Sequence, residues 1–169
     1  MIRALSQFTH AVSDILVRVA AAGLVLMTVI VGWQVFGRYV LNSTPSWSEQ
    51  AALALMIWYV SLAAAAGVRQ GFHIRIVALE EAAGPLIRKA MQVFSNAVVG
   101  ACGLAMLIWG GELVLRTWSH AVPSLNIPRG LVYLGLPISG ALMALFSLER
   151  ILELLNAQPI KDEEDPRWN

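Results

Sequence analysis

The sequence predicts an all-α integral membrane protein with four transmembrane helices. Hydrophobic residues make up 57% of its 169 residues and charged residues only 14%, whereas an ordinary soluble domain has about 25% charged residues. Four long windows contain no Asp, Glu, Lys or Arg, and charged residues bracket each window at both ends. The windows are Val19–Gly37, Gln50–Val68, Ala90–Gly111 and Gly130–Leu148, with 19, 19, 22 and 19 residues.

These lengths match a lipid bilayer, because a helix needs about 20 residues to cross a hydrocarbon core of roughly 30 Å. A charge at the centre of a spanning helix costs about 2.5–3.5 kcal/mol, so spanning segments exclude charge. A soluble helical bundle is the alternative, but each of its helices would need a polar stripe. The four windows have none.

The first window follows an N-terminal arm whose apolar residues, Ile2, Leu5, Phe8, Val12 and Ile15, recur every three or four positions. That spacing fits a helix lying in the membrane interface, and it fits equally well a simple extension of the first spanning helix. The first window is longer than the apolar part of a signal peptide and lacks a small-residue cleavage site. We expect it to remain as a membrane anchor.

The remaining connections are short. The segment 72–88 mixes apolar and charged residues, which suits a surface helix that ends at Gly84-Pro85. Pro128 stands where the fourth helix could begin. We therefore predict a single transmembrane domain over residues 1–160, followed by a polar tail at 161–169.

The distribution of basic residues predicts the orientation, because Lys and Arg concentrate on the cytoplasmic side. The arm, the second connection and the tail contain 2, 4 and 3 basic residues, nine in total. The first and third connections contain 1 and 2, three in total. Both termini are therefore predicted in the cytoplasm, with connections 38–49 and 112–129 outside.

The windows contain no ionisable group that could move a proton, an ion or a solute. His10, His73 and His120 lie outside them, and Cys102 is the only cysteine. This pattern argues against a proton-coupled exporter, a membrane haem protein and a thiol oxidase, and no catalytic set can assemble at one place. We predict no catalytic site, cofactor, metal or nucleic-acid partner.

Small residues cluster in the second and third windows, at Ala63–Gly67 and at Gly100, Gly103, Gly110 and Gly111. Such residues allow helices to approach closely. Four helices expose much of their circumference, so these faces suggest that another protein docks there. A membrane protein with contact surfaces but no site is typical of a subunit in a larger assembly.

Several motifs in the chain resemble the small membrane subunit of tripartite ATP-independent periplasmic (TRAP) transporters. The specific block runs through Phe36–Asn42, Pro45–Glu49, Trp58, Gly67–Arg69 and His73–Ile76, and the likeness resumes at Leu125–Pro128, Tyr133 and Pro137. Two positions depart from the family pattern. Gln50 stands where a second Glu is frequent, and Val77-Ala78 occupy a stretch that commonly has an Asp.

The resemblance implies a non-catalytic subunit beside a large multi-helix membrane subunit. In this family a periplasmic solute-binding protein delivers an organic acid or similar solute, and a sodium gradient drives its uptake. The large subunit holds the solute and sodium sites, and the small subunit is similar to a fixed brace. The two departures weaken any essential role for acidic groups at those positions.

Candidate functional residues follow from their positions at the ends of the windows. The interface or structural candidates are Arg38, Trp47, Glu49, Gln50 and Arg69. The candidates for contact with phospholipid or the cytoplasmic edge of the partner are His73 and Arg75, and those for contact with the binding protein are Arg116, His120 and Arg129. For Arg38 and Glu49 we expect an ion pair or a contact with the large subunit, or simple capping of their helices.

Two other classes of function stay open from sequence alone. One is an assembly or scaffold protein of the bacterial inner membrane that is unrelated to transport. The other is a membrane enzyme whose site the sequence does not reveal. Co-purification with a large membrane partner would favour the transporter subunit, and activity of the isolated chain would favour the enzyme.

Overall fold

The computed structural model describes residues 2–70 and 84–156, and four helical segments within them are long and apolar enough to span a membrane. Helix α1 covers Ile2–Tyr39, α2 covers Ser48–Gln70, α4 covers Pro85–Thr117 and α6 covers Gly135–Asn156. Strands β1 (Ala121–Val122) and β2 (Ile127–Pro128) and the short helix α5 (Arg129–Tyr133) connect α4 to α6. The predicted all-α fold with four membrane-spanning helices is confirmed.

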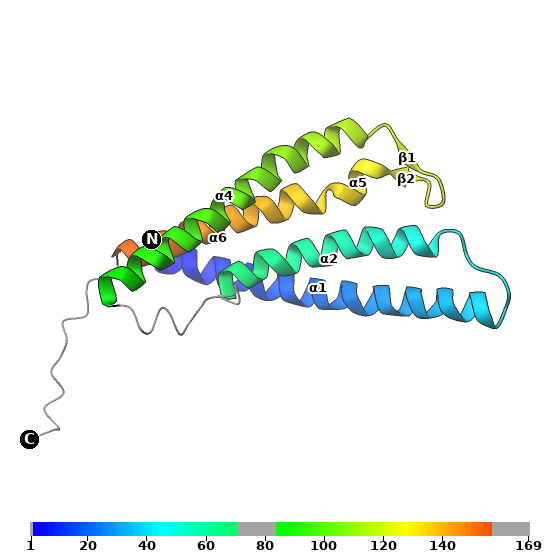
Figure 1. Ribbon diagram of the computed structural model, residues 1–169, viewed down its shortest axis with the longest axis horizontal. Helices are drawn as coiled ribbons and strands as arrows, with labels where there is room; N and C mark the ends of the chain where they lie inside the picture. Colours follow the sequence, from blue (N-terminus) through cyan, green and yellow to red (C-terminus); the bar gives the residue numbers. More distant parts are fainter. Residues whose placement is uncertain (1, 71–83, 157–169) are drawn as a thin grey trace, which may run out of the picture.

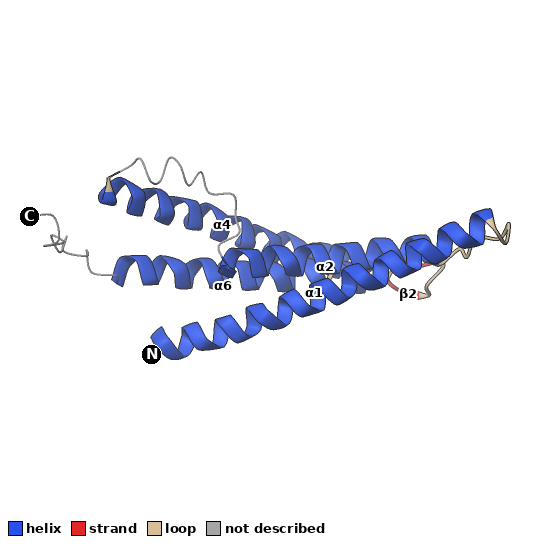
Figure 2. Ribbon diagram, turned by 90° about the horizontal axis from the view of Figure 1, so that it is seen from below, coloured by secondary structure: helices blue, strands red, loops and turns tan. Residues whose placement is uncertain are grey.

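The four long helices lie in the order α1, α2, α6, α4 and do not form a closed bundle (Figure 1). Helix α2 packs on α1 and α6, and α6 packs on α2 and α4. We call the end with residues 40–47 and strands β1 and β2 the hairpin end, and the opposite end the terminal end. Viewed from below, the N-terminus lies at the terminal end, far from β2 (Figure 2).

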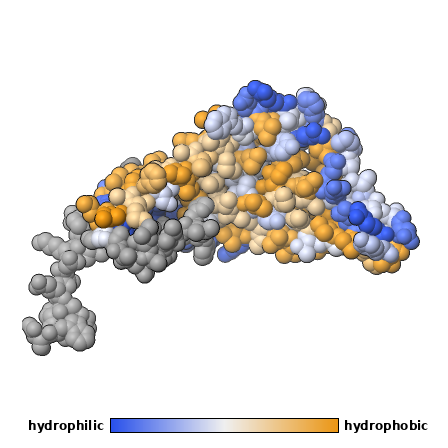
Figure 3. Space-filling view, viewed as in Figure 1, coloured by the Kyte–Doolittle hydropathy of each residue, from blue (hydrophilic) through white to orange (hydrophobic). Residues whose placement is uncertain are grey.

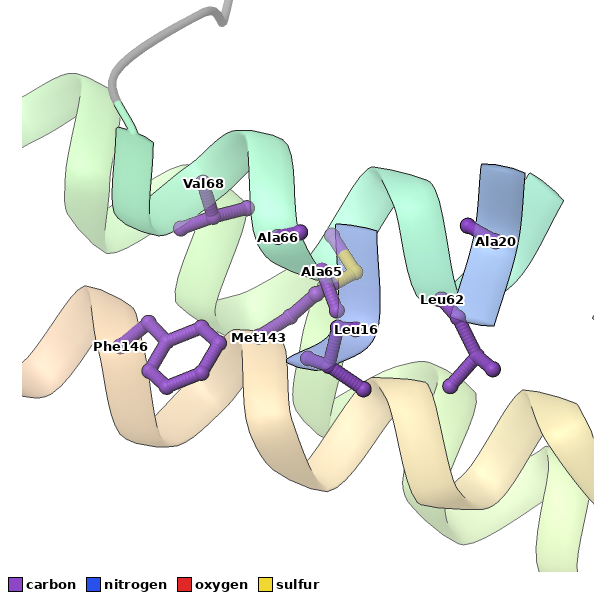
Figure 4. Close-up of a cluster of buried hydrophobic side chains, with 8 residues drawn as sticks. All are labelled: Leu16, Ala20, Leu62, Ala65, Ala66, Val68, Met143 and Phe146. Atoms are coloured by element: carbon purple, nitrogen blue, oxygen red, sulfur yellow. The ribbon is translucent and has the colours of Figure 1, made fainter. Parts of the chain in front are cut away.

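A cluster of buried apolar side chains joins α1, α2 and α6 (Figure 4). Its members are Leu16, Ala20, Leu62, Ala65, Ala66, Val68, Met143 and Phe146. All of the α2 members come from the second half of that helix, near the terminal end. The small residues of the 63–67 block are thus partly used for packing inside the chain, because Ala65 and Ala66 are almost fully buried.

Helices α4 and α6 approach so closely that glycine is required at their contact. A Cβ atom on Gly140 would lie 2.6 Å from the Gly103 carbonyl oxygen, and a Cβ on Gly103 would lie 2.8 Å from the Ala144 nitrogen. These distances are shorter than any van der Waals contact allows. Gly103, one of the glycines predicted to permit close approach of helices, therefore does so within the chain itself, whereas Gly111 contacts no other helix in the described part of the chain.

Helix α1 is continuous through the N-terminal arm and the first window (Figure 2). Its 38 residues span about 57 Å at 1.5 Å per residue, far more than the bilayer core of roughly 30 Å. Of the two alternatives for the arm, the structure has the simple extension and no bend into the span. Thr9 and Ser13 are buried, so this extension packs inside the molecule.

The fourth window contains a break that the charge pattern did not predict. Helix α5 ends at Tyr133, and α6 begins at Gly135 with Pro137 in its first turn. Proline lacks the backbone N–H that would continue the helical hydrogen bonds. The Trp58 indole Nε1 of α2 donates to the Leu131 carbonyl oxygen at 3.2 Å and so ties the short helix α5 to α2.

Two motif segments owe their residue types to turn geometry at the hairpin end. A Cβ on Gly37 would lie 2.8 Å from the Ser43 carbonyl oxygen, and Asn42 has a φ of 48°. Asn126 has a φ of 53° in the turn between β1 and β2. Asparagine tolerates this left-handed conformation better than most residues, which explains why asparagine occurs at both turns.

The surface of the molecule is mainly apolar along the helices and hydrophilic at the hairpin end (Figure 3). The outer helices α1 and α4 bury the smallest share of their apolar windows. Large exposed apolar side chains include Val29 and Trp33 on α1 and Phe94, Ile108 and Trp109 on α4. In water such surfaces would drive aggregation, whereas lipid or another membrane protein accommodates them.

A buried ion pair and an open cleft at opposite ends of the molecule

A buried polar cluster at the terminal end joins three helices. Arg69 lies in the last turn of α2, and its Nε is 3.4 Å from Glu149 Oε2 on α6. Thr9 Oγ1 on α1 donates to Glu149 Oε1 at 2.9 Å and accepts a hydrogen bond from Arg69 Nε at 3.2 Å. The Glu149 side chain is 2% exposed and that of Arg69 is 11% exposed. The cluster thus ties α1, α2 and α6 together through neutralised charges.

Removal of one charged member of this cluster is expected to be more costly than leaving the cluster intact. Removing one partner of a buried ion pair leaves a charge in a medium that solvates it poorly, which costs about 3–5 kcal/mol. Glu149 Oε2 has the ion pair but no hydrogen bond among the described residues. Arg69 at the C-terminal end of α2 also complements the negative end of the helix dipole.

Arg69 is among the interface or structural candidates predicted from the sequence, whereas Thr9 and Glu149 are not. Glu149 was only the charge that ends the fourth window. One sequence feature is compatible with burial of Glu149 but not of its neighbour. Glu149 and Arg150 are adjacent, so their side chains point in different directions around the helix. The structure buries the first and leaves the second partly exposed, where Arg150 Nη1 pairs with Glu153 Oε2 at 3.2 Å.

An open cleft of about 400 Å³ lies at the hairpin end, between α2 and the β1–β2–α5 connection. Its polar lining residues are Glu49, Gln50, Arg129 and Tyr133. The apolar core that joins α1, α2 and α6 lies toward the terminal end, so the cleft lies on the other side of this core, at the hairpin end. The structure thus brings together Glu49 and Gln50, which were interface candidates, with Arg129, a candidate for contact with the binding protein.

Strands β1 and β2 fix the position of Arg129 at this cleft. Ala121 pairs with Pro128 and Val122 with Ile127 in antiparallel register. The Arg129 backbone N–H donates to the His120 carbonyl oxygen at 2.7 Å and closes the hairpin. Val122 is buried and also lines the cleft.

The other candidates lie apart from one another. Arg38 and Trp47 are exposed near the 40–47 turn, and the described residues contain no ion pair between Arg38 and Glu49. Arg116 is exposed at the end of α4 and pairs with Glu112 one turn earlier. His120 is exposed beside β1. His73 and Arg75 lie outside the described residues, as do the 161–169 tail and most of segment 72–88, for which a surface helix was predicted.

Within residues 2–70 and 84–156, no three His, Cys, Asp or Glu side chains are grouped so as to hold a metal ion. Cys102 is exposed on α4. The titratable groups that are buried in this part of the chain form the Arg69–Glu149 pair, whose charges compensate each other.

Four long apolar helices, a self-compensating polar cluster and large exposed apolar faces define a multi-pass membrane protein of the subunit type. Residues 27–157 match the family model described as the DctQ component of tripartite ATP-independent periplasmic transporters. The chain belongs to this family, whose members are the small, non-catalytic permease subunits of TRAP transporters. The resemblance drawn from the motifs is confirmed.

Three curated relatives are similar over most of their length. A TRAP transporter small permease protein of Haemophilus influenzae is 24% identical over 92% of this chain and 94% of its own. The sialic acid TRAP transporter small permease protein SiaQ of Vibrio cholerae is 23% identical over 75% of this chain and 73% of its own. The C4-dicarboxylate TRAP transporter small permease protein DctQ of Vibrio cholerae is 23% identical over 90% of this chain and 75% of its own.

Proposed function

We propose that this chain is the fixed brace of a sodium-coupled transporter that takes up an organic acid or a similar solute. Its membrane partner is a large multi-helix subunit, and a periplasmic solute-binding protein docks transiently on the complex. Two of the relatives are named for sialic acid and C4-dicarboxylates, and both compounds are organic acids. Family membership supports the tripartite assembly.

The observation that carries the proposal is the lack of an available buried charge within the described helices. Glu149 is the buried ionisable residue there, and its carboxylate is already engaged by an ion pair with Arg69 and a hydrogen bond from Thr9. A solute or sodium site in the membrane requires polar groups that are free to bind. We infer that those groups belong to the large subunit, while this chain supplies apolar surface that holds the subunit in place.

The proposed placement follows the basic residues, with both termini in the cytoplasm and the hairpin end in the periplasm of a bacterial inner membrane. His73 and Arg75 would then face the cytoplasmic phospholipid surface, where each basic side chain gains about 1 kcal/mol. Arg116, His120 and Arg129 would lie on the side of the binding protein. A scaffold protein unrelated to transport is the alternative, which the family match disfavours.

Reconstitution tests the proposal directly. Proteoliposomes would contain the large subunit alone, this chain alone, or both, with an inward sodium gradient and the loaded binding protein outside. We expect uptake only when both membrane chains are present, together with co-purification of the two. Uptake by this chain alone would contradict the proposal, and so would undiminished uptake by the large subunit alone.

A further inference from the structure

The cleft at the hairpin end combines two kinds of lining in one amphipathic space. Away from the start of α2 its wall is apolar, and it is formed by Leu53, Ala54, Met56, Ile57 and Val132. Toward the start of α2 and α5 it is polar and carries opposite charges. An amphipathic ligand matches this arrangement, because one part can contact the apolar wall while a polar part remains at the mouth.

The charges at the mouth have no partner among residues 2–70 and 84–156. Glu49 lies in the first turn of α2, and Arg129 is the first residue of α5. Neither side chain forms an ion pair or hydrogen bond with any other residue in the described ranges. The nearby basic residue Arg116 differs, because it pairs with Glu112 on its own helix. The cleft therefore offers one free guanidinium and one free carboxylate.

We propose that this cleft binds a zwitterionic phospholipid with a primary ammonium, of the phosphatidylethanolamine type. Arg129 binds the phosphate, because guanidinium groups form strong charge-assisted hydrogen bonds to phosphate oxygens. Glu49 accepts hydrogen bonds from the ammonium, and Gln50 and Tyr133 can bind the remaining headgroup oxygens. An acyl chain then lies along the apolar wall formed by Leu53 and Met56.

Charge complementarity selects this class among the common lipids. An anionic phosphatidylglycerol headgroup would satisfy Arg129 but leave Glu49 beside a negative charge. A choline headgroup has the positive charge but no N–H to donate to the Glu49 carboxylate. Only a headgroup with a phosphate and a donating ammonium satisfies both side chains. The bound lipid would fill the cleft between α2 and the β1–β2–α5 connection at the hairpin end.

Native mass spectrometry of the full chain, purified in detergent, tests the proposal. The chain is titrated separately with phosphatidylethanolamine, phosphatidylglycerol and phosphatidylcholine of identical acyl chains, and the fraction carrying one lipid is measured. We expect phosphatidylethanolamine to bind about fivefold more tightly than either competitor, which is the scale of one charged contact at a lipid surface. Equal binding of the three lipids would overturn the proposal.

Variants locate the site. Arg129→Gln should weaken binding of phosphatidylethanolamine about fivefold, and Glu49→Gln should abolish its advantage over phosphatidylglycerol. Arg116→Gln is the matched control, because Arg116 is an exposed arginine near the same end whose partner is Glu112. An equal loss in the Arg116→Gln variant would overturn the proposal. Circular dichroism of each variant verifies that the helices are intact before the titration.

A competing occupant of the cleft is a helix of the large subunit. Met56→Cys would then cross-link to that subunit in the assembled complex. Neither the isolated chain nor the complex would bind phosphatidylethanolamine in preference to the other two lipids. That result would replace the lipid site with a protein interface. Retention of the headgroup preference by the complex, with Met56→Cys not cross-linked, supports the lipid site.

Discussion

At the scale of single residues, the Arg69–Glu149 pair is the buried ion pair of the described structure. Its two charges come from helices separated by the whole of α4 in the chain, and Thr9 adds a third helix. Such a pair contributes little net stability compared with apolar residues of the same shape, but breaking it is costly. Its benefit is specificity, because only one alignment of α2 on α6 brings the two charges together.

The Arg69→Met variant tests this view. It leaves the buried Glu149 carboxylate with the Thr9 hydroxyl as its only donor among the described residues, so the free energy of unfolding should fall by about 3–5 kcal/mol. The double variant Arg69→Met with Glu149→Leu should recover most of that loss, since no charge stays buried. Both are measured by SDS titration monitored by circular dichroism.

Arg150→Met is the matched control for that experiment. Arg150 follows Glu149 directly, is 38% exposed and pairs with Glu153. An ion pair at this exposure contributes about 0–1 kcal/mol. If the Arg150→Met and Arg69→Met variants lost equal stability, the buried pair would have no special role.

A second prediction at this scale concerns Trp58. Its indole N–H binds the Leu131 carbonyl oxygen near the break between α5 and α6. Trp58→Phe removes this hydrogen bond while retaining an aromatic ring, so we expect a loss of about 0.5–1.5 kcal/mol in the free energy of unfolding. Trp109→Phe is the control, because Trp109 is 68% exposed and its indole forms no hydrogen bond with any of the described residues. Comparable losses in both variants would argue against a role for the hydrogen bond.

At the scale of helices, close packing of α4 on α6 depends on Gly103 and Gly140. The backbone atoms of the two helices approach within the space that a methyl group would occupy. Each helix thereby gains van der Waals contact along its length, which is the main attraction between helices in a bilayer. Gly111, one helical turn or more away on α4, has no atom within 4 Å of a Cβ position.

Gly140→Ala should therefore separate α4 from α6. The added methyl group would lie 2.6 Å from a backbone oxygen and 2.7 Å from the Leu107 nitrogen, and backbone atoms cannot give way as a flexible side chain can. We expect a loss of about 1–3 kcal/mol, the usual cost of overpacking. Thermal unfolding in detergent measures the loss.

Gly111→Ala provides the opposite expectation on the same helix. Alanine favours helix over glycine by about 1 kcal/mol, and the methyl group meets no atom of the chain within 4 Å. The variant should be as stable as the wild type or more so. If both glycine variants lost stability to the same extent, helix contact at Gly140 would not be the cause.

The sequence predicted the helices better than their contacts, for a physical reason. Charge exclusion reports the depth of each residue in the bilayer and identified all four spans, whereas the motifs identified the resemblance to the family. It does not report which face of a helix meets another helix, so the Arg69–Glu149 pair escaped notice. The break at Leu134 also escaped notice, because Pro137 lies in an uninterrupted apolar window and changes hydrogen bonding without changing hydropathy.

At the scale of the whole molecule, the arrangement of helices gives the chain two distinct ends. The terminal end contains the buried ion pair and most of the apolar core, and the hairpin end opens into a polar-mouthed cleft. Helices α1 and α4, which have the long exposed faces, are the two outer helices in the order α1, α2, α6, α4. A layer of this shape can contact a large partner along one side while both ends stay accessible to water.

The orientation of these ends in the membrane is the remaining prediction, and cysteine labelling tests it. Cys102 is first replaced by Ala, and single cysteines are then introduced at His10 near the terminal end and at Ser43 in the hairpin-end turn. Both native side chains are exposed. A maleimide that cannot cross the inner membrane is added to cells with a permeabilised outer membrane. The nine basic residues of the arm, second connection and tail, against three in the other connections, predict labelling of Ser43→Cys alone. His10→Cys should react only after the inner membrane is lysed, which also proves that the thiol is accessible. Labelling of His10→Cys before the inner membrane is lysed would show the opposite orientation. The lipid cleft and Arg129 would then lie on the cytoplasmic side, away from the binding protein.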